Sequence, residues 1–296
     1  MLKKIIFVFT IVCFSLVTST VRLNGNVKLL KNYCIDYSLE DDDFYDIPGL
    51  QTDYVPQGIC LLKNKDYTYR LITAYDCTNR ENSCLYVITN HGEHIKTLFF
   101  NNSVGVHVGG VTSDASGSYV YVCDSKNNII RIYDSNSIHI STNDQLLEEV
   151  ISYPVENVPS FISYDFFNDS ILVGSFSLQN NSKLVEYSLN FEKLNEISIP
   201  KQIQGITRLS TGEFVLSQSY GSNNDSYLLI GNIDNKEFKC TSKIKLPPCL
   251  EEIYSTDNDN IFLLFESAAK RFKSKNPIDK VILLLIWIIK ESMSIF

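Results

Sequence analysis

The sequence lacks the residue spacings that identify the commonest catalytic and metal-binding motifs. It contains no Gly-x-Ser-x-Gly nucleophile elbow, no glycine-rich phosphate loop, no His-Glu-x-x-His and no Cys-x-x-Cys. These absences argue against α/β-hydrolase, nucleotide-phosphate, zincin and zinc-finger sites. An excess of basic residues is also missing, because 26 Lys and Arg stand against 34 Asp and Glu. The net charge of -8 argues against nonspecific binding to nucleic acid or anionic lipid.

Helical periodicity is nearly absent beyond the first 20 residues. The chain instead shows short runs rich in Tyr, Val, Ile, Leu and Phe, such as Tyr69–Tyr75, Tyr119–Cys123 and Ile171–Phe176. Asn, Asp, Ser and Gly separate these runs. This pattern predicts an all-β fold. A helical turn is expected only at Gln145–Val150.

A repeat decides which all-β fold to expect. In five segments, polar or glycine residues lead into an apolar strand: Pro56–Ile59, Val108–Val111, Val158–Phe161, Ile203–Ile206 and Leu250–Ile253. Successive steps are 52, 50, 45 and 47 residues, from Gly58 to Gly110, Ser160, Gly205 and Glu252. This period is typical of a four-stranded propeller blade. The sequence therefore predicts a β-propeller of five blades, or six if the chain ends build a whole blade.

The two ends of the chain are expected to close the ring. We predict a strand in Val27–Leu39 that pairs with the terminal stretch Ile278–Ile289, followed by an acidic loop over residues 40–56. The apolar run Val281–Ile289 is too short to span a membrane as a helix, so a buried last strand is favoured over a membrane-associated tail.

The first 19 residues have the features of a signal peptide. Lys3 and Lys4 precede the apolar run Ile5–Val17, and small or β-branched residues allow cleavage after Ser19. An uncleaved membrane anchor is the alternative. The predicted organisation is a signal peptide at 1–19, an N-terminal segment at 20–55 that holds the ring-closing strand and the acidic loop, and a propeller at 56–296. Four Asn-x-Ser sequons support secretion weakly and lie in expected loops: Asn101, Asn168, Asn180 and Asn224.

The cysteines are compatible with an oxidising compartment. Their total is 8, and Cys77 with Cys84 and Cys240 with Cys249 flank short segments that disulfides could close. Cys60 and Cys123 lie inside expected strands, where they are predicted to be buried apolar residues.

The propeller pattern predicts where a site lies. Strands alternate in direction within a blade, so the start of each innermost strand and the end of the second strand share one face. Seven predicted ligand-binding residues come from these positions: Gln57, His107, Gln204, Ser219, Tyr220, Glu251 and Glu266. A set of four carboxylates could hold a hard cation such as Ca²⁺: Asp76, Asp124, Glu251 and Glu266.

Two interpretations of this mouth are open. In one, Gln and Glu side chains satisfy backbone N–H groups of neighbouring inner strands and have a purely structural role. In the other, the carboxylates and amide oxygens bind Ca²⁺, and His107 or Glu251 acts as acid or base on a substrate.

Several of these segments occur together in the order of a known family. The order of Val55–Gly58, His107–Val111, Ile203–Gly205, Ser217–Gly221, Pro247–Glu251 and Phe265–Ala269 resembles a family of secreted bacterial propeller-like proteins of uncertain function. The resemblance implies a propeller and export. That family tends to have Arg where Ser222 stands and Gly where Glu252 stands, so an anion-binding role of the Arg is in doubt here. More distantly, the architecture is similar to lactonase-like and strictosidine-synthase-like propellers.

The favoured function is that of a secreted binding or interaction module. Its partner would be an extracellular protein, a glycan or a small molecule. The alternatives are a Ca²⁺-dependent hydrolase of the lactonase or phosphotriesterase type with its site at the mouth, or a degenerate member that has lost its chemistry. No nucleic-acid partner and no stable membrane span after signal cleavage are expected.

Overall fold

The computed structural model describes residues 44–256, 259–272, 274 and 277–285. Strands dominate, and the described part holds one short helix, α2 (Ser135–Ile140), which the Asp134 side chain caps by accepting a hydrogen bond from the Ser137 N–H. The helical turn expected at Gln145–Val150 is therefore wrong, since those residues include the two-residue strand β9 (Leu146–Leu147). No helix in these ranges is long and apolar enough to cross a membrane.

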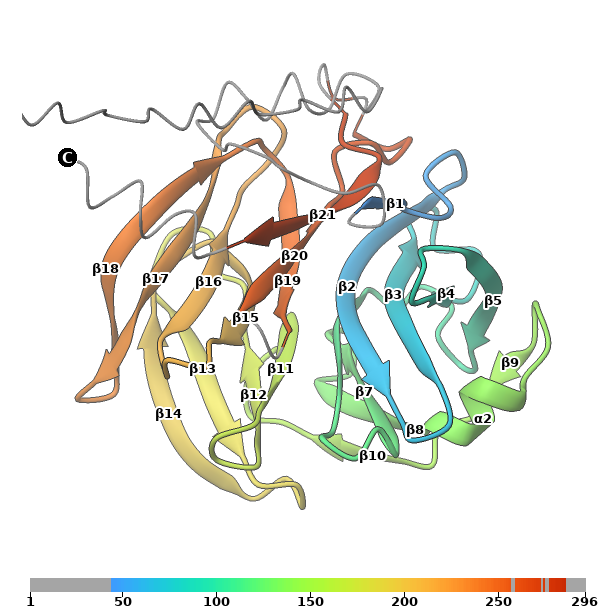
Figure 1. The fold of residues 1–296 in the computed structure, drawn as a ribbon, viewed down its shortest axis with the longest axis horizontal. Helices are drawn as coiled ribbons and strands as arrows, with labels where there is room; N and C mark the ends of the chain where they lie inside the picture. Colours follow the sequence, from blue (N-terminus) through green and yellow to red (C-terminus); the bar gives the residue numbers. More distant parts are fainter. Residues whose placement is uncertain (1–43, 257–258, 273, 275–276, 286–296) are drawn as a thin grey trace, which may run out of the picture.

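The strands form five blades around an axis (Figure 1). Each blade is a meander of antiparallel strands. The first contains β2 (Tyr54–Lys63), β3 (Thr68–Asp76), β4 (Cys84–Thr89) and β5 (His94–Phe100), to which β9 adds one parallel edge. The second contains β6 (Val108–Ser113), β7 (Tyr119–Asp124), β8 (Ile129–Asp134) and β10 (Ile151–Pro154).

The next two blades touch at their outer strands. One contains β11 (Phe161–Asp165), β12 (Ser170–Gly174), β13 (Ser182–Tyr187) and β14 (Lys193–Ile199). The other contains β15 (Ile203–Arg208), β16 (Phe214–Gln218), β17 (Ser226–Asp234) and β18 (Glu237–Leu246). A single parallel pair, Ser198 with Glu237, joins them.

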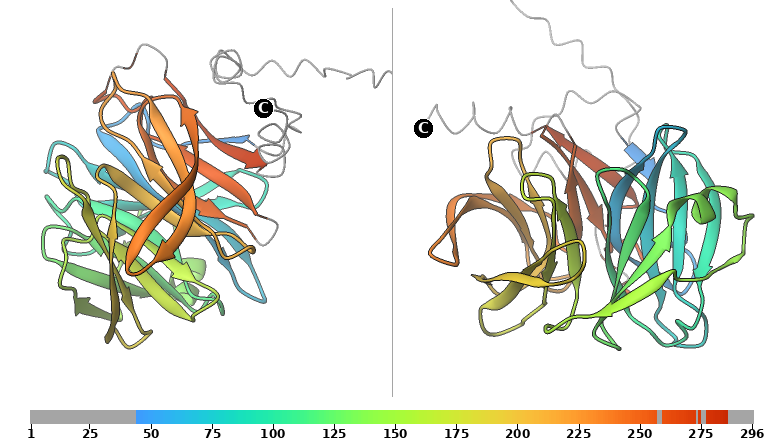
Figure 2. Two further views of the ribbon diagram at one scale, coloured as in Figure 1. Left: turned by 90° about the vertical axis from the view of Figure 1, so that its left-hand side faces the viewer. Right: turned by 90° about the horizontal axis from the view of Figure 1, so that it is seen from below.

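The fifth blade confirms that strands from both ends of the chain close the ring. It contains β19 (Leu250–Ser255), β20 (Asn260–Phe265), β21 (Lys280–Leu285) and β1 (Phe44–Asp46). Strand β1 pairs antiparallel with β21, so the blue start of the described chain lies beside its red end (Figure 2). The expected partner Val27–Leu39 lies outside the described residues. The closing strand instead falls in the stretch expected to be an acidic loop. Val281 to Leu284 are buried, as expected for a last strand.

Turns between the first and second strands follow the sequence pattern. Gly117, Asp169, Gly212 and Asp259 all have positive φ, at 63°, 51°, 88° and 60°. Glycine and aspartate tolerate this left-handed conformation better than β-branched or bulky residues. These turn residues therefore reverse the direction of the chain between the first two strands of a blade. The core lies between neighbouring blades and consists of aliphatic side chains such as Ile132 and Ile162.

The repeated glycines lie where innermost strands approach one another at the axis. A Cβ on Gly58 would lie 2.7 Å from the Val111 nitrogen, and one on Gly110 would lie 2.7 Å from the Ile162 nitrogen. A Cβ on Gly205 would lie 3.0 Å from the Ile253 nitrogen. Each of these three innermost strands also has a register irregularity beside its glycine. The repeat seen in the sequence therefore marks the layer of the ring in which the innermost strands pack most closely.

The expected disulfides are not formed. The six described cysteines are free thiols: Cys60, Cys77, Cys84, Cys123, Cys240 and Cys249. Cys84 is buried opposite Ala74 in the β3–β4 ladder, whereas Cys77 lies beyond the end of β3. Cys240 is exposed on the outermost strand of the fourth blade, and Cys249 is buried just before the innermost strand of the fifth. Cys60 and Cys123 are buried as expected.

Candidate functional site

The starts of the innermost strands surround a cavity of about 480 Å³, which we call the entry mouth. Residues from all five blades line it, as the repeat predicts. Its polar lining includes Gln57, His107, Ser125, Ser160, Gln204, Glu251, Glu266 and Arg271. Tyr75, Val158, Phe176 and Phe272 complete its wall on the apolar side. Five of the seven predicted ligand-binding residues therefore meet in one cavity.

Gln57 connects an imidazole to a pair of carboxyl groups. Its Oε1 lies 2.5 Å from His107 Nε2, and its Nε2 donates to Glu266 Oε2 at 3.4 Å and to the Pro56 carbonyl at 2.8 Å. The carboxyl groups of Glu251 and Glu266 hydrogen-bond to each other. Because the Gln57 oxygen faces the ring, His107 carries its proton on Nε2 and donates it to Gln57.

Both carboxyl groups keep their protons to a higher pH than free glutamate does. Burial raises the pKa of Glu266 to about 7, and burial together with the adjacent Glu266 carboxylate holds the pKa of Glu251 well above its usual range. Two buried carboxyl groups in contact cannot both ionise cheaply. The entry mouth therefore offers one protonated and one ionised carboxyl group at the same time.

Arg271 provides the positive charge beside this pair. Its Nη1 donates a hydrogen bond to the Tyr75 hydroxyl, and its charge lowers the pKa of Glu266 against the larger effect of burial. The Tyr75 ring packs against the His107 ring at 4.0 Å between centroids. Partial removal from water, followed by the nearby Arg271 guanidinium, lowers the pKa of His107 to about 4. His107 is thus neutral at pH 7.

Two of the predicted metal ligands do not face the entry mouth. Asp76 accepts hydrogen bonds from the backbone N–H groups of Thr78, Arg80 and Glu81, which lower the pKa of Asp76 although burial raises it. Asp124 forms a buried ion pair with Arg131 at 2.7 Å. Both carboxylates stabilise turns or strands. Within the described ranges, no group of three or more His, Cys, Asp or Glu side chains is placed to hold a metal ion.

Ser219 and Tyr220 also lie off the cavity. The Ser219 hydroxyl accepts a hydrogen bond from Ser226, and the Tyr220 side chain is exposed on the following loop. Both belong to a strand end on the same face, but neither lines the entry mouth.

Arg271 is the charged residue of the entry mouth that sequence reasoning missed. It lies in the turn after β20, where the Ala269 N–H bonds the Glu266 carbonyl and the Phe272 N–H bonds the Ala269 carbonyl. These bonds bring the guanidinium back toward the Glu266 carboxyl group. In the sequence, Arg271 is marked only by its position five residues after Glu266, which follows a strand. That spacing does not recur in the other repeats, so the repeat pattern did not predict it.

Glu252 lies at the narrow level beneath the entry mouth. Its side chain is 1% exposed, and its Oε1 accepts the Ile253 N–H at 3.2 Å. A Cβ on Gly110 or Gly205 would overlap its carboxyl group. Glu252 therefore occupies the space between two glycines and bonds inner-strand backbone, which is the structural role considered for polar residues of the mouth.

Comparison with known proteins shows the fold. No family model and no curated protein sequence matches the chain. The structure is similar to glutaminyl cyclase from Myxococcus xanthus, with a TM-score of 0.55 and 10% identity over 82% of this chain and 93% of that one. It is also similar to the PQQ-bound aldose sugar dehydrogenase from Streptomyces coelicolor, with a TM-score of 0.53 and 10% identity over 81% and 97%. Both likenesses identify a β-propeller and no activity.

Proposed function

We propose that the protein is a binding module whose entry mouth takes a small uncharged polyol, such as a terminal sugar of a glycan. The observation that carries this proposal is the pair of buried Glu251 and Glu266 carboxyl groups, which lines the cavity together with Arg271. One ionised carboxyl group and one guanidinium nearly cancel in charge, so the cavity favours neither a strong anion nor a strong cation.

The rest of the wall supports a sugar-like ligand. Carboxyl and amide groups accept and donate hydrogen bonds, as the hydroxyl groups of a polyol require. Tyr75, Phe176 and Phe272 add flat apolar surface for the C–H face of a ring. A volume of about 480 Å³ is in the range of small-molecule sites.

Thermal unfolding of the mature chain with a panel of monosaccharides and methyl glycosides tests the proposal. A ligand at 100 times its dissociation constant stabilises the folded state by about 2.7 kcal/mol. We expect at least one sugar to raise the melting temperature, and Glu251→Gln to weaken its binding by about tenfold or more, which is about 1.4 kcal/mol. Glu192→Gln is the control, because Glu192 is exposed and does not line the cavity. A panel without any shift, or a Glu251→Gln variant that binds as well, would contradict the proposal.

A hydrolase is the second candidate, and the pKa of Glu266 near 7 favours it. Neighbouring protonated and ionised carboxyl groups are the arrangement that general acid–base catalysis uses. Calcium fits this mouth less well than an organic substrate, because two carboxyl groups face the cavity and the Arg271 charge opposes a divalent cation. Turnover of lactones, glycosides or phosphotriesters that Glu251→Gln abolishes, with and without added Ca²⁺, would favour the hydrolase and decide whether it needs the metal.

A further inference from the structure

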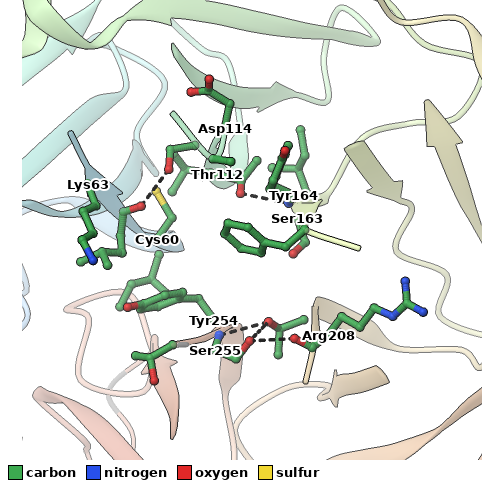
Figure 3. Close-up of a pocket in the computed structure, with 18 of the residues that line it drawn as sticks. Cys60, Lys63, Thr112, Asp114, Ser163, Tyr164, Arg208, Tyr254 and Ser255 are labelled. Carbon is green, nitrogen blue, oxygen red and sulfur yellow. Dashed lines mark hydrogen bonds between the residues drawn. The ribbon is translucent and has the colours of Figure 1, made fainter. Parts of the chain in front are cut away.

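The opposite end of the ring holds a second cavity, of about 430 Å³, which we call the exit mouth (Figure 3). It is lined where the five innermost strands end. Its wall includes Ile59, Cys60, Val111, Thr112, Ile162, Ser163, Tyr164, Thr207, Ile253, Tyr254 and Ser255. Lys63, Lys65, Asp114, Phe166 and Arg208 lie around its rim. The proposed polyol site uses none of these residues.

A closely packed layer of innermost-strand residues separates the two mouths. Along the innermost strands, Gln57, Gly109 and Gln204 line the entry mouth, whereas Ile59 and Val111 line the exit mouth. Between them lie Gly58, Gly110 and Gly205, with the buried Glu252 side chain against two of these glycines. A molecule in the exit mouth therefore does not reach Glu251 or Glu266.

The interior of the exit mouth presents polar and apolar surface in similar amounts, and many of its residues have hydroxyl groups. Ser113 Oγ donates to the Leu61 carbonyl at 2.8 Å, and Thr112 Oγ1 accepts the Tyr164 N–H at 3.1 Å. Thr207 Oγ1 and Ser255 Oγ lie 2.7 Å apart. These hydroxyl groups are occupied in joining neighbouring innermost strands. Beside them, aliphatic side chains and the Tyr254 and Phe166 rings form the apolar part of the wall, which suits a flat apolar body.

The charge at the rim of the exit mouth is positive. Arg208 is neutralised by Asp165 at 2.7 Å, and Asp114 accepts the Tyr119 N–H at 2.9 Å, with its carboxylate directed away from the cavity (Figure 3). Lys63 and Lys65 are exposed and form no ion pair within the described residues. Two lysines outside ion pairs thus lie beside this cavity on a chain whose net charge is -8.

We infer that the exit mouth is a second ligand site, for a small flat apolar molecule that carries an anionic group. The rings and aliphatic side chains hold its body, and Lys63 and Lys65 attract its charge from the β2–β3 turn. The anion remains at the rim in contact with water, so the lysines contribute steering and modest affinity, and the apolar body contributes most of the binding free energy.

Fluorescence titration of the mature chain with 8-anilino-1-naphthalenesulfonate tests this site, because the probe has flat apolar rings and one sulfonate. We expect saturable enhancement with one site per chain. N-phenyl-1-naphthylamine, which lacks the sulfonate, should bind several-fold more weakly. The double variant Lys63→Glu with Lys65→Glu should weaken the sulfonate probe by about tenfold and remove its advantage over the neutral probe. Equal affinity for both probes in the parent chain would overturn the anionic part of the inference.

Filling variants locate the probe. Ser163→Trp fills the exit mouth and should abolish the enhancement, whereas Ser125→Trp fills the entry mouth and should leave it unchanged. Phe166→Ala keeps the test decisive if Ser163→Trp does not fold, since the Phe166 side chain is 66% exposed and its loss spares the core. Phe166→Ala should lower the affinity several-fold. Unchanged binding in Phe166→Ala and in folded Ser163→Trp, or loss of binding in Ser125→Trp, would overturn the site.

Discussion

The raised pKa of Glu266 makes the stability of the protein depend on pH. Free glutamate releases its proton near pH 4.5, and folded Glu266 releases it near pH 7. Between these values the folded state binds more protons than the unfolded chain, so the free energy of unfolding falls as the pH rises. The pKa difference corresponds to about 3 kcal/mol.

We therefore expect Glu266→Gln to remove part of this pH dependence. Urea unfolding at about pH 5 and about pH 7.5 measures it: the parent chain should lose about 2–3 kcal/mol more than the variant between the two values. Glu192→Gln, an exposed glutamate outside the mouth, should behave as the parent chain does. An identical pH dependence in Glu266→Gln and the parent would show that Glu266 titrates normally.

A glycine at the axis provides a second prediction at this scale. Gly110→Ala places a methyl group 2.7 Å from the Ile162 nitrogen and against the Glu252 carboxyl group, so an innermost strand must move. We expect a loss of about 2–4 kcal/mol in denaturant unfolding. Gly221→Ala is the matched control, because Gly221 has a positive φ of 67° but no atom within 4 Å. Its loss should stay near 1–2 kcal/mol, the cost of the left-handed backbone alone. Equal losses would argue against close packing at the axis.

The convergence of Gln57, His107, Gln204, Glu251 and Glu266 was predictable because strand alternation decides which strand ends share a face. The directions of Asp76 and Asp124 were not, since a side chain at a strand end can turn toward the axis or into its own turn. Asp76 turns to cap three backbone N–H groups, and Asp124 turns toward Arg131 seven residues later. Neither interaction has a repeat pattern.

Among the elements, the pairing of β1 with β21 closes the ring. The sequence indicated closure by both ends, but a three-residue strand beside acidic residues shows no alternation from which to locate it. In the structure, Tyr45 of β1 is buried, and the Arg70 guanidinium of β3 lies over the Tyr45 and Phe262 rings, at 4.7 Å and 4.8 Å from their centroids. Arg70 of the first blade thus contacts two aromatic rings of the fifth blade through its guanidinium.

Tyr45→Ala should therefore weaken the closure. It opens a cavity between the first and fifth blades and leaves the buried Arg70 guanidinium with one ring in place of two. We expect a loss of about 3–5 kcal/mol in denaturant unfolding, as for other large buried aromatic residues. Tyr220→Ala, at a side chain that is 45% exposed, should cost less than about 0.5 kcal/mol. A small loss in Tyr45→Ala would mean that β1 contributes little to ring stability.

At the scale of the whole molecule, the five-blade ring separates a mouth that holds two buried carboxyl groups from a mouth of mixed polar and apolar surface with a basic rim. The repeat was sufficient to predict the ring and one mouth, because both follow from strand order. The second mouth was not predictable. Its lining depends on the Ser113 and Thr207 hydroxyl groups forming hydrogen bonds between blades, and that depends on which strand ends meet in space.

The whole-molecule prediction concerns export. All four sequon asparagines lie in turns or bends, and strand alternation places Asn180 and Asn224 on the face of the entry mouth. If the chain passes through a eukaryotic secretory pathway, we expect the mature protein to begin at Thr20 and to carry glycans that enzymatic deglycosylation removes. Intact-mass measurement and N-terminal sequencing of the secreted protein check both points. The double variant Asn180→Gln with Asn224→Gln should lose about half of the glycan mass while keeping its melting temperature. An N-terminus at Met1 on membrane-bound material would instead favour an uncleaved anchor, and would place the ring beside a lipid surface.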